Sequence, residues 1–200
     1  GRASTRAQPD ALPVGASTGL SVGADGGATL LIEVGRLPGR NRLRFTGRLG
    51  NVMQESAETV LGHLRLGPER YGVARAALDG EFHVHVPEAA TPKDGPSAGV
   101  ALFVAMLSVA RGAAARADVA FTGEVTLNGR VLPVGGVRAK LLAAERAGLK
   151  RVVVPADNRP DVPDDVRVEV IAVETLDEVV SLAFEDKNPR KARSNERRAP

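Results

Sequence analysis

The sequence predicts an α/β protein, in which mixed strands and helices form layers within a single compact domain. Three observations support this prediction. Short apolar strands alternate with helices through the C-terminal half of the chain, which is typical of layered α/β folds. The 200 residues suffice for one sizeable core. The contents of 43% hydrophobic and 26% charged residues are ordinary for a globular domain.

The ends of the chain differ in composition from its middle. Residues 1–27 are rich in Gly, Ala, Ser and Pro without a sustained period, so we expect a linker or disordered segment there. The domain is predicted at residues 28–184, and residues 185–200 are predicted to form a basic disordered tail. The chain starts at Gly1 and its first methionine is Met53, so we expect a fragment or a processed product.

Much of the positive charge lies in this tail, although the net charge of the whole chain is only +3. A basic tail can contact nucleic acid through the phosphates. The tail has no aromatic residues for base stacking, so a solvated terminus is the favoured interpretation and weak nucleic-acid binding is the alternative. The basic residues concerned are Lys187, Arg190, Lys191, Arg193, Arg197 and Arg198.

The first part of the domain is predicted to contain two strands and a helix. Residues 29–34 are β-prone and apolar, and residues 42–46 alternate between apolar and charged side chains. The turn sequence at residues 37–39 predicts that these strands pair as a hairpin. A helix follows at about residues 51–65, with a buried stripe made of Met53, Ala57, Val60, Leu61 and Leu64.

Two histidines alternate with apolar residues in the strand predicted at residues 82–86. His83 and His85 share the side opposite the apolar residues. Such a pair can hold a metal, but a third ligand is needed and His63 is the only other histidine. We therefore expect no metal site and predict that the two imidazoles line or support a cleft.

The second part of the domain is predicted to alternate between strands and helices. The elements expected there are a strand at 118–124, a hairpin at 125–132 with a type I′ turn at Asn128-Gly129, a helix at 137–147 closed by Gly148, strands at 151–155 and 166–173, and a helix at 175–182 with Thr175 as its N-cap.

A polar turn at residues 91–99 leads into the apolar run 100–110, whose spacing predicts a helix buried on one face. Pro96 fits the first helical position, which places Ser97 in the first turn among backbone N–H groups without intrahelical partners. These donors and the positive end of the helix dipole favour formation of an oxyanion there. The alternative is that Ser97 only caps the helix.

The helix predicted at residues 137–147 carries a lysine on its apolar stripe. Val137, Lys140, Leu141 and Ala144 recur at the i, i+3, i+4, i+7 spacing of one helix face. Burial of a charged lysine is costly and lowers its pKa, which would allow Lys140 to act as a general base. The alternative is that its ammonium reaches the surface along that face. Periodicity alone does not decide between the two.

Several motifs resemble the proteolytic domain of Lon proteases. They are FTGRLG at residues 45–50, MQES at 53–56, FHVHVPE at 82–88, PKDGPSAG at 92–99, FTGE at 121–124 and LPVGGVRAK at 132–140. The resemblance runs from about Gly19 to Leu182 without large gaps. The octapeptide at 92–99 is similar to the Lon subfamily with an ATPase module in the same chain. One departure lies at residues 19–22, where the family often has an aromatic residue.

The resemblance implies a Lon-type fold and a serine endopeptidase with a Ser–Lys dyad. Ser97 matches the family nucleophile and Lys140 the general base, while Thr122 matches the threonine that hydrogen-bonds the lysine. A serine hydroxyl needs an adjacent base to become a good nucleophile, and Ser–Lys is a recognised arrangement. Asp94 and Glu124 also match family positions. Asp94 either caps the helix or contacts the lysine in an inactive state, and the sequence leaves its role and that of Glu124 open.

The same resemblance implies partners for a longer protein. We expect unfolded or damaged polypeptides as substrates, a ring of six subunits and a cytoplasmic location. ATP and Mg²⁺ would be bound by an ATPase module outside this chain, because no G-x-x-x-x-G-K-[ST] motif is present and no cofactor is expected here. The absence of cysteine permits a cytoplasmic setting. No run approaches the roughly 20 apolar residues of a membrane span, so no membrane partner is expected.

Two other functions compete with a peptidase. One is a non-catalytic Lon-like scaffold, but such domains typically lack the serine or the lysine, and this chain has both Ser97 and Lys140. The other is a nucleic-acid-binding module, which would depend on the basic tail.

Overall fold

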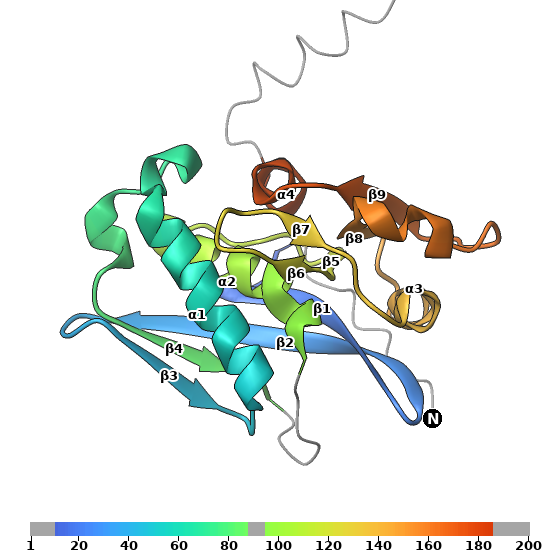
Figure 1. The fold of residues 1–200 in the computed structure, drawn as a ribbon, viewed down its shortest axis with the longest axis horizontal. Helices are drawn as coiled ribbons and strands as arrows, with labels where there is room; N and C mark the ends of the chain where they lie inside the picture. The colour runs from blue at the N-terminus through green and yellow to red at the C-terminus, as the bar shows by residue number, and fades with distance from the viewer. Residues whose placement is uncertain (1–10, 88–94, 186–200) are drawn as a thin grey trace, which may run out of the picture.

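A computed structural model describes residues 11–87 and 95–185. Its main sheet has seven strands in the order β3-β4-β2-β1-β5-β8-β9 (Figure 1). These strands are β1 (Ala16–Gly23), β2 (Gly26–Leu37), β3 (Arg42–Thr46), β4 (Glu81–His85), β5 (Val119–Phe121), β8 (Arg151–Pro155) and β9 (Glu169–Val173). A separate two-stranded sheet consists of β6 (Glu124–Val125) and β7 (Val131–Leu132).

The helices are α1 (Asn51–Leu66), α2 (Gly99–Arg111), α3 (Val137–Arg146) and α4 (Leu176–Ala183). Short 3₁₀ helices cover Pro68–Tyr71, Arg75–Leu78, Pro96–Ala98 and Ala156–Asp161. The predicted α/β class is therefore confirmed. No helix in the described part of the chain is both long enough and apolar enough to cross a lipid bilayer.

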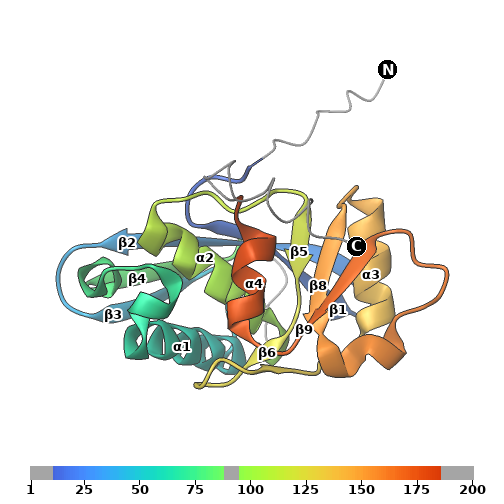
Figure 2. The same cartoon turned by 90° about the horizontal axis from the view of Figure 1, so that it is seen from above.

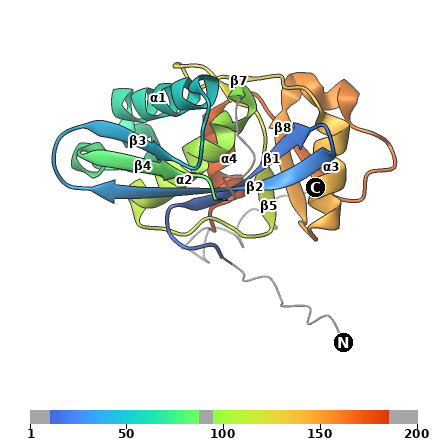
Figure 3. The ribbon, with the colours of Figure 1, turned by 90° about the horizontal axis from the view of Figure 1, so that it is seen from below.

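Helices cover both faces of the sheet. The larger core contains buried residues of α1, α2 and α4, and the smaller core forms between α3 and the strands β1, β5 and β8. Seen from above, α4 crosses the molecule beside α2 (Figure 2). Seen from below, the long β2 runs from α3 at one end to β4 and β3 at the other (Figure 3). Strand β2 thus extends across both parts of the molecule, the part that contains α3 and the part that contains β3 and β4.

Helix α2 is more buried than the sequence predicts. The prediction was one buried face, but every residue from Gly99 to Ser108 is buried. The helix lies between the sheet, α1 and α4, so tertiary packing covers all of its sides. An unbroken apolar run is compatible with this position, because an all-round apolar helix belongs in a core. Its end at Gly112, in the left-handed conformation, agrees with the prediction.

The predicted linker at residues 1–27 was wrong for its second half. Residues 16–23 form β1, which pairs antiparallel with β2 and contributes Ala16 and Leu20 to the buried residues. The sequence analysis missed this strand because its small and polar residues give only a weak apolar period. The first ten residues and the tail after residue 185 lie outside the described part.

The predicted hairpin between residues 29–34 and 42–46 was also wrong. Strand β4 lies between β2 and β3, antiparallel to β2 and parallel to β3. The local turn therefore does not join paired strands. Strand β4, some 40 residues later along the chain, is inserted between β2 and β3. Its alternating residues Phe82 and Val84 are fully buried on the side of the sheet that α1 covers (Figure 1). The sides predicted for β4 are confirmed.

The turn between β6 and β7 differs from the predicted type I′. Asn128 does not have a positive φ, and only Gly129 does, at 84°. The Gly129 N–H donates to the Thr126 carbonyl, and the Thr126 N–H donates to the Arg130 carbonyl. This is the longer loop in which an ordinary turn precedes a left-handed glycine. The pairing itself, Val125 with Val131, is as predicted.

The remaining elements agree with the sequence in position, with small shifts at their ends. Helix α1 buries its predicted stripe, α3 is followed by Gly148 at φ 74°, and β8 has the predicted bounds. Strand β9 starts at Glu169 instead of residue 166, because the Arg167 N–H donates to the Glu145 carboxylate of α3. Thr175 holds the N-cap position of α4, but its hydroxyl donates to Glu178 instead of capping the helix.

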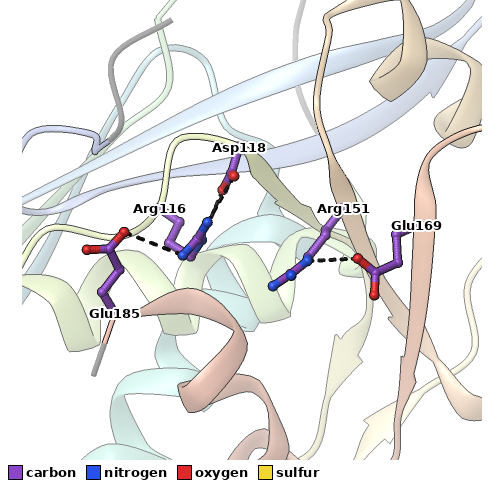
Figure 4. Close-up of polar contacts among 5 residues, drawn as sticks. All are labelled: Arg116, Asp118, Arg151, Glu169 and Glu185. Carbon is purple, nitrogen blue, oxygen red and sulfur yellow. Dashed lines mark hydrogen bonds and ion pairs between the residues drawn. The ribbon is translucent and has the colours of Figure 1, made fainter. Parts of the chain in front are cut away.

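Ion pairs tie the C-terminal elements together at the surface (Figure 4). Arg116 donates to both carboxylate oxygens of Asp118 at 3.0 Å and contacts Glu185 beyond α4 at 3.5 Å. Arg151 of β8 pairs with Glu169 of β9 at 2.9 Å. The Arg151–Glu169 pair is exposed and contributes at most about 1 kcal/mol, whereas the Arg116–Asp118 pair is partly buried.

Candidate active site

Ser97 lies where the sequence places it. It occupies the centre of the 3₁₀ turn Pro96–Ala98, which continues directly into α2 and begins with Pro96. No side-chain cap is formed at the start of either helical segment in the described residues, so the capping interpretation of Ser97 is not supported. The half-buried hydroxyl is left at the positive end of a buried helix.

Two backbone hydrogen bonds fix the Ser97 turn to the chain after β5. The Gly123 N–H donates to the Ser97 carbonyl at 2.9 Å, and the Val100 N–H donates to the Gly123 carbonyl at 3.1 Å. A side chain on Gly123 would lie 2.7 Å from the Val100 methyl group and 2.8 Å from that of Val131. Only a glycine allows this close approach, which explains why T-G follows β5.

Lys140 is buried on α3, with 2% of its surface exposed. Its amine Nζ donates to Thr122 Oγ1 at 3.1 Å. Burial lowers the pKa of Lys140 from 10.5 to about 8. The alternative in which this side chain reaches the surface is therefore wrong: the apolar stripe of α3 faces the sheet, and the amine is enclosed with it.

Thr122 and the next residue, Gly123, lie between Lys140 and the Ser97 turn. Thr122 lies just beyond the end of β5, where β1 and β5 pair at Gly19 and Phe121. Lys140 approaches its hydroxyl from the α3 side of the sheet, and the next residue, Gly123, binds the Ser97 turn from the α2 side. No hydrogen bond joins Ser97 to Lys140 directly within the described residues. The Lys140 amine and the backbone of the Ser97 turn are nevertheless hydrogen-bonded to two adjacent residues.

A cleft of about 370 Å³ opens beside Ser97. One wall is the β1–β2 ribbon with its turn, and the other contains Met53 of α1 and the chain around Ser97. A larger cavity of about 460 Å³ lies near α4, lined among others by Arg70, Arg111 and Asp177. Its arginines already bind Asp177 and the Tyr71 carbonyl. We place the site in the smaller cleft, because its serine, Ser97, lies at the start of a buried helix, whereas the serine of the larger cavity, Ser181, lies near the end of α4.

His83 and His85 do not enter the Ser97 cleft. Both hydrogen-bond the Thr46 hydroxyl, from His83 Nε2 at 2.8 Å and from His85 Nδ1 at 2.6 Å. They thus support the contact between the ends of β3 and β4 in place of lining this cleft. No group of three His, Asp or Glu side chains in the described residues is arranged to hold a metal. Glu124 is half-buried in β6, and Asp94 lies outside the described part.

The sequence interpretation missed one wall of the cleft. Residues 20–26 and 28 line it, and most of them fall in the segment predicted to be a linker. A usable signal was present: residues 16–22 contain alternating apolar positions, and a turn with Gly26 separates them from the strand that was recognised.

Comparison with known proteins shows the family of this chain. Residues 3–186 match the family model of the Lon protease (S16) C-terminal proteolytic domain. The chain is 48% identical over 177 residues to a Lon protease of Azospirillum brasilense, covering 86% of this chain and 22% of the relative. It is 50% identical over 165 residues to the Lon protease of Mycolicibacterium smegmatis, covering 82% and 21%.

A third relative, the Lon protease of Escherichia coli (strain K12), is 46% identical over 179 residues, covering 86% of this chain and 23% of the relative. The chain therefore spans about a fifth of the length of these curated relatives.

Proposed function

The chain belongs to the Lon protease (S16) C-terminal proteolytic domain family and is a serine peptidase, and we propose that it uses Ser97 as nucleophile and Lys140 as general base. The observation that carries this proposal is the buried Lys140 amine, whose only hydrogen bond in the described residues goes to the threonine beside the Ser97 turn. A structural lysine would instead reach water or a carboxylate.

The uncharged amine of Lys140 takes the proton of the Ser97 hydroxyl while Oγ attacks the carbonyl carbon of the peptide bond. Backbone N–H groups of the Ser97 turn stabilise the resulting oxyanion, since those of Gly99 and Val100 already donate to the Pro96 and Gly123 carbonyls. The protonated lysine then gives its proton to the leaving amine, and an acyl-enzyme remains on Ser97. Water, deprotonated by the same lysine, releases the acid and restores the serine. With a pKa of about 8, roughly one lysine in ten is uncharged at pH 7.

Thr122 has a supporting role in this proposal. Its hydroxyl accepts a hydrogen bond from Lys140 Nζ, which orients the amine without neutralising it by a charge. A carboxylate in the same place would raise the lysine pKa and keep the base protonated. A hydroxyl holds the Lys140 amine in position, and the pKa of the lysine is then set by burial.

For the longer protein we propose ATP-dependent degradation of unfolded or damaged polypeptides in the cytoplasm, by a hexameric ring. ATP and Mg²⁺ would bind to an ATPase module outside this chain. The proposal is supported by the family and by the share of the relatives that this chain spans. Light scattering on the longer protein at micromolar concentration tests the ring, and a monomer would contradict it.

Labelling with a serine-directed inhibitor tests the catalytic assignment. We expect a single modified residue, Ser97, identified by peptide mapping, and loss of peptide hydrolysis in Ser97→Ala with an unchanged fold. Ser181→Ala is the control, because this serine is exposed on α4 and far along the chain from the cleft. Modification of another serine, or equal hydrolysis by Ser97→Ala and the wild type, would refute the assignment.

A further inference from the structure

The β1–β2 ribbon meets α3 at the residue before the buried lysine. A side-chain carbon built on Gly27 of β2 would overlap the carbonyl oxygen of Ala139 and lie 3.1 Å from the backbone nitrogen of Lys140. Atoms do not approach this closely without a shift of the backbone. The absence of a side chain at Gly27 therefore sets the distance between the ribbon and the turn of α3 that carries Lys140.

Two further contacts hold the ribbon in this place. Arg146, near the end of α3, donates from Nη2 to the Gly27 carbonyl at 3.0 Å. Val22, across the ribbon, packs at the start of α3, where a side chain on Gly136 would lie 2.7 Å from its methyl group. The ribbon is thus fixed to α3 at the helix start, at Lys140 and at the helix end.

The same ribbon lines the cleft beside Ser97. Its turn carries Asp25, and Arg138 and Arg146 extend from α3, with Glu124 on the neighbouring β6. None of these charges, nor any other in the described residues, is a cause of the lowered pKa of Lys140; burial alone lowers it. A group whose pKa depends on burial alone is sensitive to the element that buries it.

We infer that Gly27 is a positioning residue for the peptidase reaction: by letting the β1–β2 ribbon lie directly on α3, it encloses the Lys140 amine, disfavours its charged form and holds it toward Thr122. This inference rests on the proposed role of Lys140 as base. It assigns a function to a residue that touches neither the substrate nor the reacting atoms.

The test is the pH dependence of Ser97 acylation in Gly27→Ala. The added methyl group pushes the ribbon away from α3, water reaches Lys140, and its pKa rises toward the ordinary value. We expect the rate profile to move up by about one pH unit, with about tenfold slower acylation at pH 7 and the wild-type rate restored above about pH 10. Gly35→Ala is the control, because Gly35 lies on the same strand and a side chain there meets nothing within 4 Å.

A second variant avoids the steric change, in case Gly27→Ala does not fold. Arg146→Leu removes the hydrogen bond to Gly27 and should move the profile in the same direction by a smaller amount. Arg138→Leu is its control, since it removes a positive charge from the same helix closer to Lys140 in sequence. An equal shift in both leucine variants would mean a charge effect and would overturn the inference.

Direct titration separates this inference from the proposed function. The pKa of Lys140 can be followed by NMR of ¹³C-labelled lysine in the Ser97→Ala background, with no catalysis needed. A Lys140 pKa unchanged by Gly27→Ala would refute the positioning role even if Lys140→Met were inactive. An active Lys140→Met would refute the base assignment, whatever Gly27→Ala does to the pKa.

Discussion

Lys140 and His63 are the two buried basic side chains of the described structure, and they differ in how completely their nitrogens are hydrogen-bonded. His63 is 3% exposed, close to the 2% of Lys140. Its Nδ1 contacts the Leu127 carbonyl at 2.8 Å and its Nε2 contacts the Tyr71 hydroxyl at 2.6 Å. Both ring nitrogens of His63 are therefore satisfied, whereas the Lys140 amine, which carries three protons when charged, has a single acceptor in Thr122.

The hydrogen-bond partners of His63 extend this contrast. Burial, and next the interaction with Asp177, raise the pKa of Tyr71, so its hydroxyl stays protonated. Leu127 offers only a carbonyl oxygen, so Nδ1 of His63 donates to it, and Nε2 pairs with the Tyr71 hydroxyl. A buried base whose hydrogen-bonding groups are all paired stabilises the fold, whereas one with unpaired groups is suited to move protons.

The largest effect is expected for Lys140→Met, which keeps the length of the side chain and removes the amine. Hydrolysis should fall at least about 10³-fold, because Ser97 loses its base. The measurement is the rate of cleavage of a short unstructured peptide, with Lys150→Met as a control at an exposed lysine. An active Lys140→Met would remove the distinction between the two bases.

The same substitution should change the pH dependence of stability. The folded pKa of Lys140 is lowered to about 8, so between about pH 8 and 10.5 the unfolded chain binds more protons and wild-type stability rises with pH. Below pH 8 the cost of the buried amine is complete, at most about 3 kcal/mol from the lowered pKa. Lys140→Met should be more stable there, as measured by urea unfolding at pH 7. A destabilised variant would contradict the burial cost.

His63→Leu should have the opposite pattern. It leaves the Leu127 carbonyl and the Tyr71 hydroxyl without their hydrogen-bond partner, so the free energy of unfolding should fall by about 2–3 kcal/mol. The peptidase rate per folded molecule should stay unchanged. Tyr71→Phe is a milder comparison, with an expected loss of about 1–2 kcal/mol. Loss of catalysis without loss of stability would give His63 the role assigned here to Lys140.

The smallest effect on hydrolysis is expected from loss of the hydrogen bond between Lys140 and Thr122. Thr122→Val keeps the shape of the side chain and removes the acceptor, so hydrolysis should fall about 10- to 30-fold, equivalent to one orienting hydrogen bond. Thr122→Ser should keep most of the rate, since it keeps the hydroxyl. Equal rates for the valine and serine variants would show that the hydrogen bond does not orient the base.

Local pattern was sufficient where an element is bounded by its own residues. The period of α3 placed Lys140 on a buried stripe, Pro96 and Gly112 bounded the α2 segment, and the alternation in β4 separated its two sides. Pattern failed where the partner is distant in the chain. Strand β4 displaced the predicted hairpin between β2 and β3, and β1 was hidden because small residues give a weak periodic signal.

The sequence by itself determined the fold class, most of the helices and the residues Ser97, Thr122 and Lys140 as candidates, because these depend on short-range periodicity and on motifs. Only the tertiary structure decided between a lysine that reaches water and one that is enclosed. That outcome depends on the β1–β2 ribbon, which approaches α3 at Gly27 from more than 100 residues earlier in the chain. Burial is a property of all the elements around a group, so no stretch of sequence containing the group alone can specify it.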